Sequence, residues 1–206
     1  GAGPIGVEMG QAFQLLGTEV TLLDQADRVL SRDDPDHAEI VRQSLASDGV
    51  AFRFGAKVER VEAADGGVRL HLGGGETVEA DRLLVAAGRR PNVENLGLDL
   101  AGVEVADKGI VVDDRCRTSQ KHIYAAGDCT GEYQLTHMSE HMAKTATTNA
   151  VLKVPATIDR EHVPWVTFSD PEMAHLGPGA KELDERGTDY EVYRFPYTKI
   201  DRAITE

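Results

Sequence analysis

Apolar residues recur at helical spacing over the first sixteen positions of the chain. The positions that define this pattern are Ile5, Val7, Met9, Ala12, Phe13 and Leu16. The spacing predicts one amphipathic helix, and Gly17 supplies the residue that ends it. A short β-rich run over 19–23 follows, so the chain opens as a loop, a helix and a strand.

A second helix and strand follow the first pair. Asp33 or Asp34 is the expected N-cap and Pro35 the first helical residue, because an acidic cap and a proline favour these positions. Apolar positions continue to Leu45, and Gly49 ends the helix. The run 50–54 then predicts the next strand.

After residue 55 the pattern changes to short strands separated by glycine-rich turns. Strands are expected at 58–63, 68–72 and 77–80, which predicts an antiparallel meander. The nearly continuous apolar run 82–86 predicts one more strand, parallel to its neighbours and fully buried.

The second half of the chain is less regular. Short apolar strands are expected at 110–112 and 123–125, a helix at 136–152 and a linker at 155–164. Beyond the linker, β-rich runs at 163–168 and 190–195 flank a charged helix near 180–186.

Composition excludes several classes of protein. The 206 residues carry a net charge of −13 and 41% hydrophobic residues, which suits a folded, acidic chain. An acidic surface repels phosphate backbones, so nucleic acid is not an expected partner. No apolar run approaches the roughly 20 residues that a membrane span needs, and no signal-peptide pattern occurs. The cytoplasm is therefore the default compartment.

No metal or redox-cysteine site is expected within the chain. Cys116 and Cys129 match no metal-binding or redox spacing, which favours two buried, small apolar residues. His137 and His141 are four residues apart on a predicted helix, but no third ligand accompanies them.

The first six residues form a Gly-x-Gly-x-x-Gly loop, with glycines at Gly1, Gly3 and Gly6. The loop opens directly onto the first predicted helix, whose N-terminal N–H groups and dipole favour phosphate. It is therefore a candidate cradle for the pyrophosphate of a dinucleotide. Such a loop normally follows a β-strand, and no residues precede Gly1 here. We therefore expect the chain to be a piece of a longer protein.

Asp24 ends the strand that follows the first helix, at the spacing expected of a ribose-binding carboxylate. A carboxylate there can accept hydrogen bonds from both hydroxyls of the adenosine ribose. It would also repel a 2′-phosphate, which favours NAD over NADP, although nearby Arg28 keeps NADP open. The alternative is that Asp24 only caps a strand.

Four motifs in order resemble those of the flavoprotein disulfide reductases, the family of dihydrolipoamide dehydrogenase, glutathione reductase and mercuric reductase. They are GAGPIGVE at 1–8, VAAGRRPN at 85–92, TS followed by IYAAGDC within 118–129, and FSDPE at 168–172. The resemblance spans essentially the whole chain. It implies an NAD loop, a return to an FAD domain, a second FAD motif and the entry to a dimerisation domain.

The resemblance also implies roles for individual residues. Ile5 joins the three glycines of the NAD loop, and Gly88 belongs to the return segment. Glu8 would lie near the nicotinamide and the flavin, or be only an exposed first-turn glutamate. Pro4 stands where many relatives carry a tyrosine that shields the flavin.

The second FAD motif ends in Gly127 and Asp128, where a small residue lets a cofactor approach the backbone. By resemblance, Asp128 hydrogen-bonds a hydroxyl of the flavin's ribityl chain; the alternative is a turn aspartate. His137 falls in a segment whose backbone touches the flavin ring in the family, although a surface helical histidine would look the same.

Together these expectations describe an α/β chain in three parts. They are a Rossmann-like NAD(P)-binding domain with an antiparallel meander and no first strand (1–87), the C-terminal part of an FAD-binding domain (88–155), and the start of an α+β dimerisation domain (156–206). Apolar surface meant for the rest of the third part is expected to be exposed around Trp165, Val166 and Phe168.

The implied parent is a homodimeric oxidoreductase that passes hydride from NADH to FAD and on to a disulfide or another small acceptor. No catalytic residue is assigned, because the family's Cys-x-x-x-x-Cys pair and His-Glu pair fall outside this chain. Two alternatives stay open. The chain alone can be an inert nucleotide-binding or association module, and the parent can be an NADH oxidase, a single-cysteine peroxidase or a ferredoxin reductase.

Overall fold

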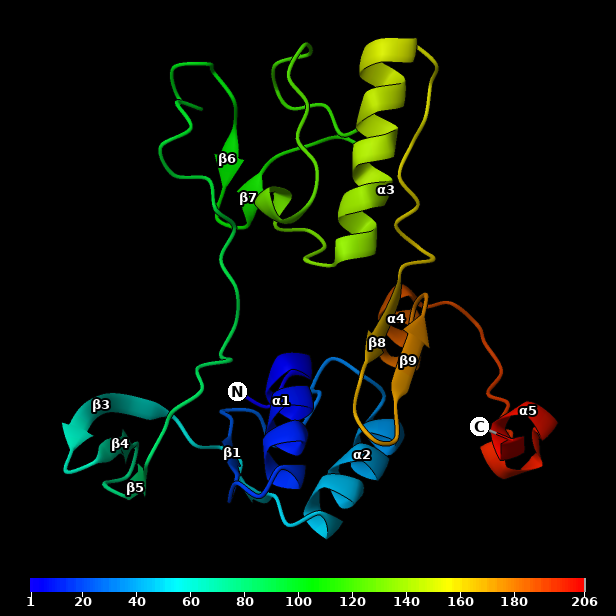
Figure 1. Cartoon of the computed structure of the whole chain (residues 1–206). Helices are drawn as coiled ribbons and strands as arrows, with labels where there is room; N and C mark the ends of the chain where they lie inside the picture. The colour runs from blue at the N-terminus through cyan, green and yellow to red at the C-terminus, as the bar shows by residue number, and fades with distance from the viewer. Residues whose placement is uncertain (206) are drawn as a thin grey trace.

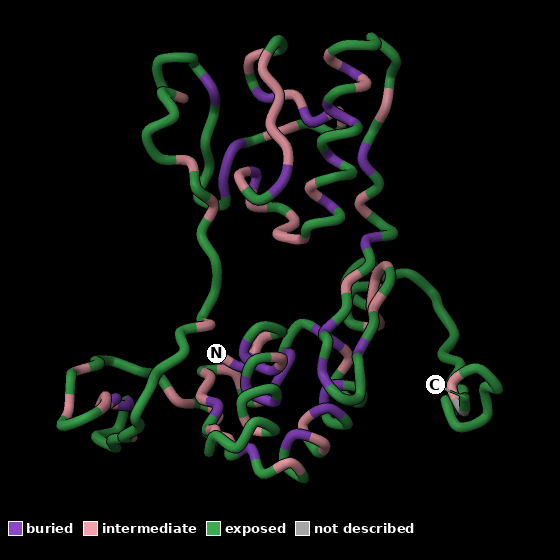
Figure 2. The backbone as a smooth tube through the Cα atoms, in the orientation of Figure 1, coloured by how far each residue is buried: buried purple, intermediate pink, exposed green. Residues whose placement is uncertain are grey.

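Two lobes joined by extended segments make up the structure (Figure 1). A computed structural model describes residues 1–205, apart from the side chain of Ile204. The first lobe contains residues 1–54 together with β8 (Pro164–Thr167) and β9 (Met173–Leu176), and the second lobe contains residues 101–152. The segment 58–80 stands apart on one side of the first lobe, and the C-terminal helix stands apart on the other (Figure 1). Buried residues gather around α1, α2 and β8–β9 in the first lobe and along α3 in the second (Figure 2).

The first helix, α1 (Pro4–Leu15), begins where expected because Pro4 is preset for a first helical position. Its buried side consists of Gly6, Val7, Gly10 and Gln11. Gly10 permits close packing, since a Cβ there would lie 3.1 Å from Leu22 Cδ2 on the neighbouring strand. The apolar side chains at 5, 9 and 13 are instead exposed by more than a third.

The second helix and the first two strands also match the sequence prediction. In α2 (Pro35–Ser47) the N-cap is Asp34, whose side chain accepts a hydrogen bond from the Asp36 N–H. The strands β1 (Thr21–Leu23) and β2 (Ala51–Arg53) pair in parallel. Their side chains and those of both helices form one core with Met173 of β9.

The predicted meander is confirmed. It comprises β3 (Val58–Ala64), β4 (Gly67–Leu72) and β5 (Thr77–Ala80), paired antiparallel in that order. The predicted buried strand at 82–86 is wrong, because the chain there is unpaired and Val85 is 75% exposed. A buried parallel strand needs hydrogen-bonded neighbours and covered faces, and the parallel sheet of residues 1–205 holds only β1 and β2.

The second lobe contains little regular structure besides one helix. A hairpin of β6 (Val105–Ala106) and β7 (Gly109–Ile110) lies beside the one-turn helix η1 (Asp128–Thr130). The strand predicted at 110–112 therefore forms only as β7, which begins one residue earlier and ends two residues earlier than predicted. The run at 123–125 forms only a single bridge between Arg117 and Tyr124.

The predicted helix at 136–152 is confirmed as α3 (Thr136–Thr147) followed by a π-helical turn, η2 (Thr148–Leu152). Met142 and Ala146 of this helix pack on Cys116 and Ile158. Cys116 is buried as expected, and burial raises the pKa of its thiol. Cys129 is half-buried, and both thiols are free.

The C-terminal part begins with an antiparallel hairpin of β8 (Pro164–Thr167) and β9 (Met173–Leu176). The charged helix α4 (Ala180–Arg186) forms as predicted. The run at 190–195 is exposed and pairs with no strand, so that prediction is wrong. The short helices η3 (Tyr197–Lys199) and α5 (Asp201–Thr205) end the described chain.

Exposure of the C-terminal apolar residues matches expectation at two of three positions. Phe168 is 69% exposed and Val166 is exposed, whereas Trp165 is half-buried. The Trp165 indole N–H donates to Asp33 Oδ1 across 2.7 Å, and its ring stacks on His175. Among residues 1–205, every helix is too short or too polar to cross a bilayer.

Candidate functional site

The glycine loop at 1–6 is tight on its inner side and open at its tip. A Cβ on Gly6 would overlap the carbonyl oxygen of Gly1, and a Cβ on Gly1 would overlap that of Ala86. Around Gly3, by contrast, a Cβ would meet nothing within 4 Å. The backbone at Gly3 is therefore accessible to a ligand, and the two outer glycines make that exposed turn possible.

The loop leads directly into the N-terminus of α1. Gly3 is the N-cap, and no side chain caps the helix. Its carbonyl already accepts the first helical hydrogen bond, from the Val7 N–H across 2.9 Å. Pro4 has no N–H, so the first-turn N–H groups without a helical acceptor are those of Ile5 and Gly6, and the helix dipole favours an anion beside them.

Asp24 ties the end of β1 to the glycine loop. Its Oδ2 accepts from the Ala2 N–H across 2.6 Å, and its Oδ1 accepts from the Ala26 N–H across 2.8 Å. The Ala2 carbonyl in turn accepts from the Leu30 N–H across 2.9 Å. Asp24 thus does more than cap a strand, because it fixes the backbone of the loop itself.

The pKa of Asp24 lies below its ordinary value. Burial raises this pKa, but hydrogen bonds from the N–H groups of Ala2, Ala26 and Gln25 and the positive charge of the N-terminus together lower it by more. Asp24 is therefore a carboxylate at neutral pH. Nearby Arg28 points elsewhere, since its guanidinium donates to the carbonyls of Leu30 and Ser31 across 3.1 and 2.8 Å.

Glu8 lies one turn into α1 and contacts the C-terminal hairpin. Its Oε1 accepts from the backbone N–H of Phe168 across 2.9 Å. Glu8 is therefore not an exposed first-turn glutamate without a partner. The contact joins residues 160 positions apart in the sequence, and α1 lies between β1 and β8 (Figure 1).

A second group of predicted residues meets in the other lobe. Arg89 donates to Asp128 Oδ2 across 3.2 Å and to the Gln134 carbonyl across 3.1 Å. Gly88 and Gly127 have φ values of +125° and +82°, which favour glycine. Arg89 thus joins the segment 88–92 to Asp128 in the motif at 118–129. Sequence reasoning missed Arg89, although its place directly after Gly88 is a usable signal.

His137 connects the two lobes. Its Nε2 donates to the Pro164 carbonyl across 2.8 Å, which joins the first turn of α3 to the start of β8. The residues at 1–8 and 24 therefore cluster in one lobe and those at 127, 128 and 137 in the other. The part of the chain that the structure describes contains no group of three or more potential metal ligands.

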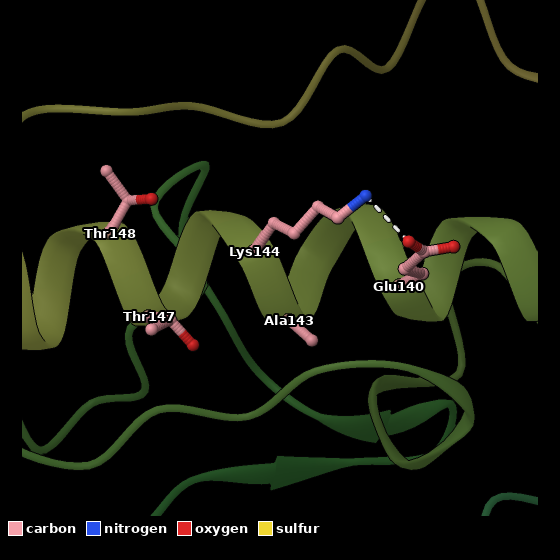
Figure 3. A pocket seen from close by; sticks show the side chains of 5 residues that line it. All are labelled: Glu140, Ala143, Lys144, Thr147 and Thr148. Atoms are coloured by element: carbon pink, nitrogen blue, oxygen red, sulfur yellow. Dashed lines mark ion pairs between the residues drawn. The ribbon is translucent and has the colours of Figure 1, made fainter.

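A shallow hollow on the outer face of α3 holds none of the predicted residues. Figure 3 shows its lining, which comes from this helix and the turn after it: Glu140, Ala143, Lys144, Thr147 and Thr148. Glu140 and Lys144 form an exposed ion pair across 2.6 Å. Because the hollow is open and lined by one helix, it does not compete with the loop site as a place for a nucleotide.

Comparison with known proteins identifies the family. Residues 1–143 match the family described as pyridine nucleotide-disulphide oxidoreductase, and residues 163–206 match its dimerisation domain. The chain belongs to the pyridine nucleotide-disulphide oxidoreductase family. The resemblance found in the sequence motifs is therefore confirmed.

Curated relatives and solved structures agree with this assignment. The chain is 38% identical to a mercuric reductase of Lysinibacillus sphaericus over 99% of its length and 38% of the relative. It is 35% identical to a dihydrolipoyl dehydrogenase of Geobacillus stearothermophilus over 99% of its length and 44% of the relative. The chain thus spans about two fifths of these relatives.

Two solved structures share the fold over nearly the whole chain. The HOCl-induced flavoprotein disulfide reductase RclA from Escherichia coli aligns with a TM-score of 0.88 and 32% identity, covering 100% of this chain and 47% of that one. LpdA from Mycobacterium tuberculosis aligns with a TM-score of 0.92 and 30% identity, covering 99% and 45%. The mixed α/β fold is that of the flavoprotein disulfide reductases.

Proposed function

We propose that this chain carries the NAD(H) site and part of the FAD site of an NADH-dependent flavin oxidoreductase. The observation that carries the proposal is the glycine loop, open at Gly3 and fixed to β1 by Asp24. In this proposal residues 1–87 form the nucleotide-binding domain. Residues 88–155 belong to an FAD-binding domain, and residues 156–206 belong to a dimerisation domain.

The loop suits a dinucleotide with a free 2′-hydroxyl. The pyrophosphate would lie beside Gly3 on the N-terminus of α1, in contact with the backbone of Ile5 and Gly6. The Asp24 carboxylate already accepts two N–H groups, and its remaining lone pairs can accept from ribose hydroxyls. Its charge disfavours NADP, and Arg28 is already engaged with backbone carbonyls.

The second lobe suits part of a flavin site. Asp128 is about half exposed, so a ribityl hydroxyl can reach it. Gly127 is buried against Ser139, and its φ of +82° sets the turn that presents Asp128. FAD, when bound, supplies the group that accepts hydride and passes electrons onward. Gly88 would belong to the segment that returns the chain from the NAD domain to the FAD domain, and the backbone at His137 would contact the flavin. Glu8 would orient the nicotinamide.

The acceptor would be a disulfide or another small molecule, and the functional unit a homodimer formed through 156–206. The match of 163–206 to the dimerisation domain favours a disulfide reductase over an NADH oxidase or a ferredoxin reductase. Neither Cys116 nor Cys129 belongs to a Cys-x-x-x-x-Cys pair, so no acceptor-reducing residue is assigned in this chain.

A substitution at Gly3 tests the nucleotide site without disturbing the fold. The φ of Gly3 is −73° and its Cβ position is open, so both Gly3→Asp and Gly3→Ser should cap α1. Only Gly3→Asp puts a negative charge where the pyrophosphate would lie. We expect NADH affinity to fall at least about 30-fold in Gly3→Asp and only a few-fold in Gly3→Ser. Equal affinities in the two variants would contradict the proposal.

A further inference from the structure

The turn between β8 and β9 is clamped onto α1 by the side chain of Gln11. Gln11 Oε1 accepts from the Asp170 N–H across 2.7 Å, and Gln11 Nε2 donates to the Asp170 carbonyl across 2.9 Å. One side-chain amide therefore pairs with both backbone groups of one residue, as a neighbouring strand would. Gln11 is only 3% exposed, so the amide end of these hydrogen bonds is shielded from water.

Two side chains of α2 reinforce this clamp. Asp48 Oδ2 accepts from Gln11 Nε2 across 2.8 Å, which fixes the orientation of the amide because a carboxylate only accepts. Ser44 Oγ donates to the Asp170 carbonyl across 2.6 Å. The turn is thus held at Asp170 by both helices of the first lobe.

The same turn holds Glu8. Glu8 and Gln11 are three residues apart on α1 and therefore lie on one face of the helix. They contact Phe168 and Asp170, which are two residues apart in the turn. Within residues 1–205 the Phe168 N–H is the only hydrogen-bond partner of the Glu8 carboxylate. The position of that carboxylate therefore depends on where Gln11 holds the turn.

We propose that Gln11 is a positioning residue for Glu8, acting through the 168–170 backbone. The inference rests on the proposed function, in which Glu8 orients the nicotinamide. Without the amide clamp, the Phe168 N–H moves away from α1 and the Glu8 carboxylate regains its free rotamers. Loss of Gln11 then weakens recognition of the nicotinamide half of NADH. The adenosine and pyrophosphate half is unaffected, because it is bound by the loop and Asp24.

The test compares NADH with ADP-ribose, which lacks the nicotinamide, in titrations of the 206-residue chain. In Gln11→Met we expect NADH affinity to fall about five- to tenfold, the effect of one hydrogen bond to a charged group, with ADP-ribose affinity unchanged. Gln14→Met is the matched control, since Gln14 lies on the same helix and accepts from the Val20 N–H inside the first lobe. It should leave the ratio of the two affinities unchanged.

Fluorescence of Trp165, the single tryptophan, reports in each variant whether the hairpin stays docked on Asp33. Should Gln11→Met fail to fold, Ser44→Ala removes one bond to Asp170 from a half-buried position and should shift the ratio in the same direction by a smaller factor. An unchanged ratio in both variants overturns the inference, as does an equal shift in Gln14→Met. If the unmodified chain binds neither ligand, the proposed function fails and the inference fails with it.

Discussion

The carboxylate of Asp24 accepts a hydrogen bond from the backbone N–H of Ala2 across 2.6 Å. The contact joins the carboxyl end of β1 to the second residue of the glycine loop, 22 positions earlier. A residue placed by its spacing to receive a ribose therefore also fixes the loop that would receive the pyrophosphate. Binding of both halves of the nucleotide should depend on this one side chain.

Removal of the Asp24 side chain should weaken NADH binding by about tenfold or more, because one substitution loosens the loop and removes a ribose acceptor. The measurement is a titration of Asp24→Ala with NADH. Asp27→Ala is the control, since Asp27 is exposed and its loss changes the net charge equally. A comparable loss of affinity in Asp27→Ala would show that charge alone accounts for the effect.

Stability should fall at acid pH partly through Asp24. Its pKa in the folded chain is lowered, so its contribution is complete above about pH 4, the ordinary aspartate pKa, and is lost as pH falls through the lower folded value. Urea unfolding at pH 6 and pH 3 measures this loss. Asp24→Asn should lose less stability between the two pH values than the unmodified chain, and equal losses would contradict the assignment.

Helix caps and glycine-rich turns in the sequence were enough to predict the helices and strands whose ends they form. Asp34 and Pro35 start α2, and the glycine-rich turns separate the three strands of the meander. The run at 82–86 has the composition of a buried strand, but pairing depends on neighbours that the described sheet does not provide. The contacts from Glu8 to Phe168 and from Gln11 to Asp170 join distant segments, and no local pattern encodes them.

Gly131 should be required for the shape of the one-turn helix η1, which begins at Asp128. It ends η1 with a φ of +67°, and a Cβ there would overlap the Lys108 carbonyl oxygen. We expect Gly131→Ala to destabilise the chain by about 3 kcal/mol or more, because strain and a backbone clash add. Gly187→Ala, with a φ of +64° and open space around the Cβ, should cost only about 1 kcal/mol. Urea unfolding of both variants measures these losses of stability. Equal losses in the two variants would contradict the structural role assigned to Gly131.

The exposed run at 83–85 should promote self-association. Val85 is 75% exposed and follows two partly exposed leucines, which makes a continuous apolar edge. Val85→Lys should weaken association about tenfold, the effect of removing one apolar side chain from a contact, and leave unfolding unchanged. Sedimentation velocity over a concentration series measures this, with Val85→Leu as the apolar control. Equal self-association of Val85→Lys and Val85→Leu would show that this edge does not mediate the contact.

We propose that the loop at 1–6 and Asp24 form a site for NADH. Its most direct test is a calorimetric titration of the unmodified chain with NADH and with NADPH in one buffer. NADH should bind at least about tenfold more tightly than NADPH, because the Asp24 carboxylate repels a 2′-phosphate. Absence of NADH binding, or tighter binding of NADPH, would contradict this proposal.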